Sequence, residues 1–203
     1  ELEDEFKIEF DFENCDEFYK NFMNWEFTGN EHPIIFARQQ ICSESSSQKD
    51  ISLGIMTLYS FITIQKEVCK NFIDNHTIKR FNELVRDSEI DFRIKNQIIG
   101  FISILCQAEK SFIHQFWSEG LQDLLIEIIS DDNPSVLLIY PIDILSRMAN
   151  WVRPAYNKLI KECNLITILL TKIRLKLAIP EQYSVLNGLS SIIASDFADL
   201  NID

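Results

Sequence analysis

The stretch "NPSVLLIYPIDILSRMANW", residues 133–151, decides the fold, because its apolar run could be a membrane segment, a buried strand or one helix of a repeat. The run Val136–Ile142 is far shorter than the roughly 20 residues that a membrane helix needs. Periodicity by itself does not distinguish a short buried strand from a buried helix. The recurrence of one apolar spacing elsewhere in the chain distinguishes the helix from the strand.

Three apolar residues of this stretch, Ile142, Leu145 and Ala149, lie at i, i+3 and i+7, the spacing of one helical face. A set with the same spacing occurs 43 residues earlier, another 44 residues before that, and one more 44 residues after the first set. These sets are Ile99, Ile102 and Cys106; Ile55, Leu58 and Ile62; and Leu186, Leu189 and Ile193. We therefore expect four helices whose buried faces share one register.

Two further apolar columns repeat at the same interval, which indicates three helices in each unit. The second column consists of Ile34, Ala37 and Ile41; Ile78, Phe81 and Val85; Leu121, Leu124 and Ile128; and Leu165 and Ile168. Lys172 interrupts the last of these rows, and Ile173 is expected to take its place. The third column consists of Val68 and Phe72, Phe112 and Phe116, and Ala155 and Leu159.

This period lies within the roughly 40–47 residues of armadillo and HEAT arrays, in which each unit buries its apolar faces against its neighbours. Residues 110–150, "KSFIHQFWSEGLQDLLIEIISDDNPSVLLIYPIDILSRMAN", resemble the armadillo-repeat family in their order: a short helix, a second opening near Gly120, and a third after the turn Asp132-Asn133-Pro134. Pro141 falls inside that third helix, where it should bend the axis. The resemblance implies an all-α fold, a right-handed α-solenoid of about four armadillo-like three-helix repeats with an acidic N-terminal arm.

The chain divides on this basis into a leader, a repeat domain and a tail. Residues 1–17 form the acidic arm, residues 18–195 the repeat domain, and residues 196–203 an acidic C-terminal tail. The units are expected at about 18–65, 66–108, 109–151 and 152–195. Because the chain turns polar and acidic after the last helix, we expect the array to end there, although a fragment of a larger solenoid is an alternative.

The net charge of −12 is concentrated in the leader, where residues 1–17 hold nine acidic side chains and one basic one. Residues 18–203 carry a net charge of only −4. The segment "EFKIEFDFE" (5–13) alternates apolar and charged residues, unlike the helical body. It is a disordered acidic tail, a strand or arm that caps the first repeat, or a linear motif that docks elsewhere. An acidic chain of this kind is expected to bind neither nucleic acid nor membrane.

The five cysteines are widely spaced and odd in number, which argues against a disulfide framework and favours a reducing compartment. The sequence has no local metal-binding motif, nucleophile elbow or phosphate loop. We therefore predict no catalytic residues, no metal, no cofactor and no small-molecule substrate. Trp25, Trp117 and Trp151 are expected in the core, and Asp50 is expected to cap the helix after the loop 42–50.

In armadillo arrays the third helices line a concave groove, and the apolar columns predict which side chains face it. These candidate partner-binding residues are Met56, Ser60, Gly100, Ile104, Asp143, Arg147, Asn187 and Ser191. Nuclear-import adaptors carry a ladder of W-x-x-x-N at the aligned positions, and no unit here keeps that pair. Asp143 and Arg147 are one turn apart and are expected to form a surface ion pair.

The function that the resemblance implies is a non-catalytic scaffold in the cytoplasm or nucleus. It would bind a protein or an extended peptide on its concave face, as a monomer or weak homo-oligomer. An alternative is a nucleotide-exchange factor for a large ATP-driven chaperone, since compact armadillo proteins of that class have a similar number of units and similar acidity. A second alternative is a nuclear-import-type adaptor that lacks the usual ladder.

Overall fold

The computed structural model describes residues 33–64, 73–131, 137–173, 177 and 179–199. Its contacts separate residues 1–32 from a compact unit, Pro33–Asp203, and only the latter contains described residues. The acidic arm, Trp25, Val68, Phe72 and the turn Asp132-Asn133-Pro134 lie outside the described ranges. Within those ranges all regular secondary structure is helical, which confirms the predicted all-α class.

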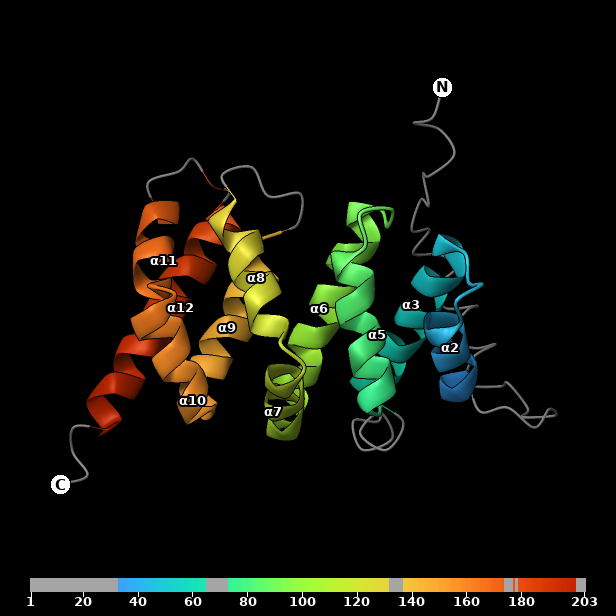
Figure 1. Ribbon diagram of the computed structural model, residues 1–203, viewed down its shortest axis with the longest axis horizontal. Coiled ribbons are helices and arrows are strands. Elements are labelled where there is room, and N and C mark those ends of the chain that lie inside the picture. Colours follow the sequence, from blue (N-terminus) through green and yellow to red (C-terminus); the bar gives the residue numbers. More distant parts are fainter. Residues whose placement is uncertain (1–32, 65–72, 132–136, 174–176, 178, 200–203) are drawn as a thin grey trace. The chain divides into compact units, whose positions relative to one another are not determined.

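The described helices follow one another along the chain as labelled in Figure 1. They are α2 (Pro33–Cys42), α3 (Gln48–Ile64), α5 (Asn75–Arg86), α6 (Phe92–Ala108), α7 (Lys110–Ser118), α8 (Leu121–Ser130), α9 (Ile139–Trp151), α10 (Arg153–Tyr156), the π-helical η1 (Asn157–Glu162), α11 (Leu165–Ile173) and α12 (Ile179–Asp199). None of these helices is long and apolar enough to cross a bilayer.

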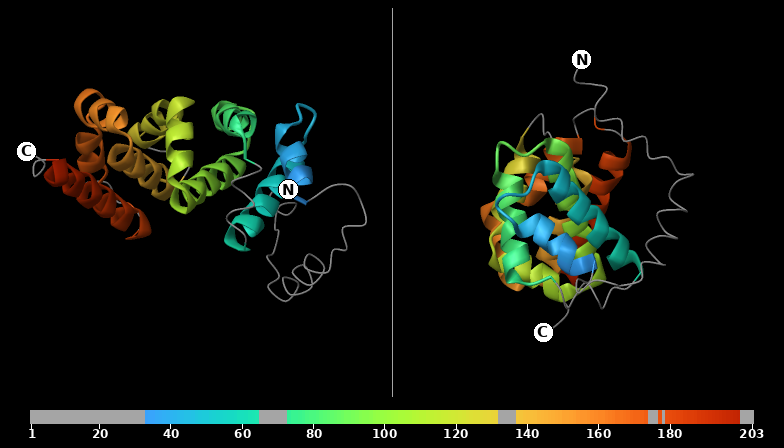
Figure 2. Two further views of the ribbon diagram at one scale, coloured as in Figure 1. Left: turned by 90° about the horizontal axis from the view of Figure 1, so that it is seen from below. Right: turned by 90° about the vertical axis from the view of Figure 1, so that its right-hand side faces the viewer.

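Four of the helices form a continuous series of contacts. Helix α3 packs against α6, α6 packs against α9, and α9 packs against α12 (Figures 1 and 2). The shorter helices contact this series and one another: α2 packs on α3 and α5, α7 and α8 pack on α9, and α11 packs on α12. Every step along the series therefore joins segments that are far apart in sequence.

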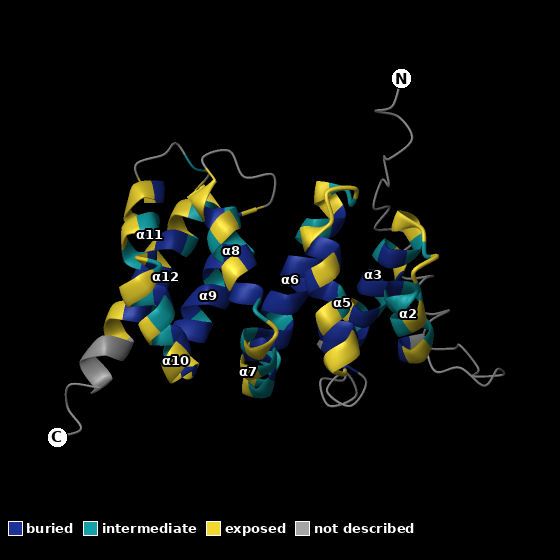
Figure 3. Ribbon diagram, in the orientation of Figure 1, coloured by how far each residue is buried: buried dark blue, intermediate teal, exposed yellow. Residues whose placement is uncertain are grey.

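The first apolar column is buried in three of its four rows (Figure 3). The buried rows are Ile55, Leu58 and Ile62 on α3; Ile99, Ile102 and Cys106 on α6; and Ile142, Leu145 and Ala149 on α9. In the fourth row, on α12, Leu189 is buried as predicted, but the prediction is wrong for Leu186 and Ile193, which are exposed. The buried residues there include Val185 and Ile192, one position earlier, so the spacing from α9 to α12 is 43 residues.

The other two columns are largely confirmed where they are described. Their buried members are Ile34, Ala37, Ile41, Ile78, Phe81, Val85, Leu121, Leu124 and Leu165 in the second column, and Phe112, Phe116, Ala155 and Leu159 in the third. The expected replacement of Lys172 by Ile173 is wrong: Lys172 is buried and Ile173 is exposed. The Lys172 ammonium donates a hydrogen bond to the Asp131 carbonyl, which satisfies a charged group in the apolar interior.

Pro141 does not bend α9, contrary to the expectation from sequence. The helix begins at Ile139, so Pro141 lies in its first turn. The first four N–H groups of a helix have no intrahelical acceptor, and the missing N–H of proline is therefore no loss there.

Local signals account for where several helices begin. Ser47 and Asp50 form a capping box at the start of α3: Ser47 N and Oγ donate to Asp50 Oδ2 at 3.1 and 2.6 Å, and Asp50 N donates to Ser47 Oγ at 3.2 Å. The N-cap residue of α3 is therefore Ser47, and Asp50, which was expected to cap this helix, is its partner in the capping box. Gly120 precedes α8 with a φ of 75°, a left-handed conformation that glycine adopts at low cost.

A glycine also permits a close approach of α3 to α2. A Cβ at Gly54 of α3 would lie 2.7 Å from the Ala37 carbonyl oxygen of α2. At Gly100 of α6 the nearest atoms belong to the ring of Tyr140, at 3.3 Å. A backbone oxygen cannot move aside as a ring can.

We predict that Gly54→Ala lowers the free energy of unfolding although alanine favours helix by about 1 kcal/mol, because overpacking costs about 1–3 kcal/mol. Gly100→Ala, the matched control in α6, should change stability less, since the Tyr140 ring can shift. Urea unfolding followed by circular dichroism measures both. Equal stability of the two variants would contradict the close crossing of α2 and α3.

The capping box predicts a pH dependence. Hydrogen bonds from the Ser47 side chain and backbone hold the pKa of the Asp50 carboxyl below its ordinary value. A carboxyl with a lowered folded-state pKa stabilises the protein above its unfolded pKa and loses that contribution as the pH falls through the folded one. Wild type should therefore exceed Ser47→Ala in stability at neutral pH, and the difference should narrow in acid to the part that the Ser47 hydroxyl contributes by accepting from Asp50 N–H.

An NMR titration of the Asp50 carboxyl checks the cause directly. Its pKa should rise towards the ordinary value in Ser47→Ala and stay lowered in the control Ser46→Ala. An unchanged Asp50 pKa in Ser47→Ala would show that the capping box is not the source of the shift.

Candidate groove on α6, α9 and α12

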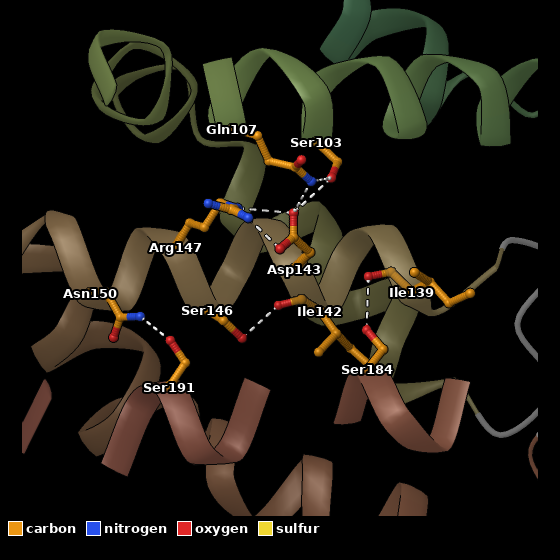
Figure 4. A network of polar contacts seen from close by, with 10 residues as sticks. All are labelled: Ser103, Gln107, Ile139, Ile142, Asp143, Ser146, Arg147, Asn150, Ser184 and Ser191. Carbon is orange, nitrogen blue, oxygen red and sulfur yellow. Dashed lines mark hydrogen bonds and ion pairs between the residues drawn. The ribbon is translucent and has the colours of Figure 1, made fainter. Parts of the chain in front are cut away.

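The Asp143 carboxylate is the centre of a polar network between α6 and α9 (Figure 4). Arg147 Nε donates to both of its oxygens at 3.0 Å, which confirms the expected i, i+4 pair on α9. Ser103 Oγ and Gln107 Nε2 of α6 also donate to Asp143 Oδ2, at 2.7 and 3.2 Å. The carboxylate therefore links two helices in addition to pairing with its neighbour one turn away.

A second set of polar contacts joins α9 to α12 (Figure 4). Asn150 Nδ2 donates to Ser191 Oγ, and Ser184 Oγ donates to the Ile139 carbonyl at 3.2 Å. Gly188 lets the helices approach closely, because a Cβ there would lie 2.8 Å from Ser146 Oγ. Ser146 Oγ in turn donates to the Ile142 carbonyl of its own helix at 2.7 Å.

These two networks form the walls of a pocket of about 730 Å³, which we call the α9 groove. It is lined by Ser103, Ile104, Gln107, Ile139, Tyr140, Asp143, Ser146, Arg147, Asn150, Trp151, Pro180, Tyr183, Ser184, Asn187, Gly188 and Ser191. Most of the lining side chains are hydrogen-bonding or aromatic. Such a lining suits a ligand that presents both main-chain polar groups and bulky side chains.

A smaller pocket of about 230 Å³ lies between α3, α6 and α9, and we call it the Tyr140 pocket. It is lined by Ile55, Met56, Tyr59, Asn96, Gln97, Gly100, Leu137 and Tyr140. Tyr140 lines both pockets. The two pockets thus adjoin along the same series of helices.

The structure brings most of the predicted site residues into these pockets. Ile104, Asp143, Arg147, Asn187 and Ser191 line the α9 groove, and Met56 and Gly100 line the Tyr140 pocket. Ser60 lines neither of these two pockets. Its hydroxyl donates to the Met56 carbonyl of its own helix at 3.0 Å. Whether any of these residues binds a partner stays a prediction.

The aromatic lining was missed by sequence reasoning. Trp151, expected in the core, is 48% exposed at the end of α9, and the Lys110 ammonium lies 3.2 Å from the centre of its ring. Tyr140 and Tyr183 also line the groove. The sequence did contain a signal for this exposure. The chain becomes more polar around Trp151, which indicates the end of a helix and not the interior of the protein. Trp117 is half-buried, with Lys158 Nζ 5.8 Å from its ring centre.

The ionisable groups near the groove show no activated nucleophile. Burial, and to a smaller extent the nearby Asp143 carboxylate, raises the pKa of the Cys106 thiol to about 12. A thiolate does not form there near neutral pH, so Cys106 behaves as a small apolar side chain. Among the described residues, no three His, Cys, Asp or Glu side chains lie together as metal ligands would.

The chain matches no model of a known protein family, and no curated protein matches it. The groove itself is therefore the best evidence for the function.

The Asp143 network predicts two unequal coupling energies. Ser103 is buried, and a hydrogen bond from a buried hydroxyl to a carboxylate contributes about 1.5–3 kcal/mol. Asp143 and Arg147 are both partly exposed, and such pairs contribute at most about 1 kcal/mol. A double-mutant cycle of Asp143→Ala with Ser103→Ala should therefore give a larger coupling than a cycle with Arg147→Ala.

Urea unfolding of the single and double variants measures both couplings. The cycle with Arg147→Ala serves as the control, because it reports a contact within one helix. No coupling between Ser103 and Asp143 would contradict the contact of α6 with α9.

Proposed function

We propose that the chain is a non-catalytic scaffold of about four armadillo-like repeats, a right-handed α-solenoid, that binds an extended peptide segment of a partner protein in the α9 groove. The series α3, α6, α9 and α12 supports the architecture, because these are the expected third helices of the four units and each packs on the next. The recurrence of buried rows at 43–44 residues supports it further. In this arrangement the groove lies on the face that third helices line.

The observation that carries the binding proposal is the chemistry of Asn150 and its neighbours. Its side-chain oxygen is buried and accepts no hydrogen bond from the described residues, while its amide nitrogen donates to Ser191. A buried acceptor without a partner is unfavourable by about 1–3 kcal/mol. A peptide N–H that enters the groove would remove that deficit.

The aromatic rings supply the second requirement for peptide binding. Trp151 and Tyr183 line the groove and are largely exposed, so a ligand side chain can pack on them. Asn187, also exposed in the lining, offers an amide that can both donate to and accept from an extended main chain. Rigid helices hold these groups in place, which lowers the entropy lost on binding.

The remaining parts of the proposal follow from the same site. The groove shows no paired acid and base and no activated nucleophile among its described residues, in keeping with a binding function. We place the protein in the cytoplasm or nucleus, where free thiols such as Cys42, Cys106 and Cys163 persist.

Selection from a random peptide library tests the proposal, followed by fluorescence polarisation with the selected peptides. We expect micromolar binding, and Trp151→Ala should weaken it about tenfold, the effect of losing a central aromatic contact. Phe92→Ala is the matched control, because Phe92 of α6 is 49% exposed and lies outside both pockets. Charge reversal at Asp143 and Arg147 should also change which peptides are selected.

Failure to enrich any peptide would contradict the proposal. So would enriched peptides whose affinity is the same for wild type, Trp151→Ala and the charge-reversed variant. Circular dichroism of each variant establishes that its helices are intact.

A further inference from the structure

The two charged side chains that line the α9 groove, Asp143 and Arg147, differ in how far their hydrogen-bonding groups are used within the described structure. The Asp143 carboxylate accepts from Ser103 and Gln107 through Oδ2 and from Arg147 Nε through both oxygens (Figure 4). A carboxylate accepts about four hydrogen bonds, so these contacts leave little of its capacity for a ligand.

Arg147 keeps most of its donors for a ligand. It donates to Asp143 only through Nε, and this contact fixes the plane of the guanidinium group. The two terminal nitrogens carry the other N–H groups of the side chain, and no described residue accepts a hydrogen bond from them. Because the side chain is 33% exposed and lines the groove, these donors are accessible from it.

A second cationic group lies near the same end of the groove. The Lys110 ammonium lies 3.2 Å from the centre of the Trp151 ring, and Trp151 follows Arg147 by one turn of α9. The lining offers no free carboxylate to either cation, because its one acidic residue, Asp143, already pairs with Arg147. This end of the groove therefore favours an anionic group on the ligand.

The unpartnered acceptor of the groove lies close to these donors on α9. Asn150, whose side-chain oxygen is buried without a hydrogen bond, follows Arg147 by three residues, a spacing of about 5–6 Å between Cβ atoms. An extended peptide advances about 3.3 Å per residue. A peptide N–H bound at Asn150 therefore brings the side chain of the same residue or of a neighbouring one to Arg147.

We infer that the α9 groove selects extended peptides with an Asp or Glu side chain, whose carboxylate binds the terminal nitrogens of Arg147. A guanidinium and a carboxylate can form two parallel hydrogen bonds, which adds geometric selectivity to the charge attraction. Asp143 is a positioning residue, because it holds the guanidinium without using its terminal N–H groups. The inference rests on the peptide-binding proposal and adds the chemical class of the peptide.

Fluorescence polarisation with labelled peptide pools tests the inference. Each pool consists of short, C-terminally amidated peptides with Glu, Gln or Lys fixed at the central position, and with Asp and Glu omitted from the random positions. Wild type should bind the Glu pool about tenfold more tightly than the Gln pool and should bind the Lys pool most weakly. A Gln pool with a free C-terminal carboxylate should bind no more tightly than the amidated Gln pool.

The double variant Asp143→Asn/Arg147→Gln isolates the guanidinium contact. Like the ion pair of the wild type, the substituted pair has no net charge, so an unpaired Asp143 cannot repel the peptide. This variant should bind the Glu and Gln pools equally. Arg147→Gln alone should also lose the preference and provides a second test if the double variant folds poorly. Arg93→Gln is the matched control, because Arg93 of α6 is exposed and lies outside both pockets, and it should keep the preference.

The outcomes separate this inference from the proposed function. A wild-type chain that binds none of the pools would contradict peptide binding itself, and the inference with it. Wild type that binds the Gln or Lys pool as tightly as the Glu pool would overturn the inference alone. So would a Glu preference that persists without Arg147, one that is lost equally in Arg93→Gln, or binding of the free-carboxylate Gln pool as tight as that of the Glu pool.

Discussion

Burial of apolar side chains between helices that lie about 43 residues apart in sequence is the constraint on which the described structure depends. Most of the stability of α3, α6 and α9 comes from the packing of their apolar faces and not from helix propensity. Ile55, Ile99 and Ile142, one from each helix, are buried only because a neighbouring helix covers them. Loss of one helix would therefore expose the apolar face of the next, and stability is shared along the series.

Polar contacts follow the same interval and fix the register in which the helices pack. Ser103 with Asp143 spans 40 residues, Asn150 with Ser191 spans 41, and Ser52 with Gln97 spans 45. Buried polar groups must find partners, so a one-residue slip between two helices would leave several of them unsatisfied. Ser103, Asp143, Asn150 and Ser191 also line the α9 groove, which is why the contacts that align α6, α9 and α12 also shape the candidate binding surface.

The sequence predicted the helical class and most of the buried positions, because apolar side chains at helical spacing indicate which face of a helix is buried. It failed at Leu186 and Ile193, since an apolar face that no neighbour covers has the same pattern as a covered one. It failed at Lys172 because a long side chain can be buried when its ammonium reaches a carbonyl, here that of Asp131. Trp151 was misplaced in the core for a similar reason: ring size does not indicate whether a helix end is covered.

The most direct test of this account is an NMR measurement of proton contacts along the series of helices. The account predicts contacts between the rings of Tyr59 and Phe101, between Gly100 and Tyr140, and between Ile142 and Gly188, at the three successive junctions. Helices α3 and α12, at opposite ends of the series, should share none. Strong contacts between α3 and α12, as a closed bundle would require, together with absence of the three junction contacts, would contradict it.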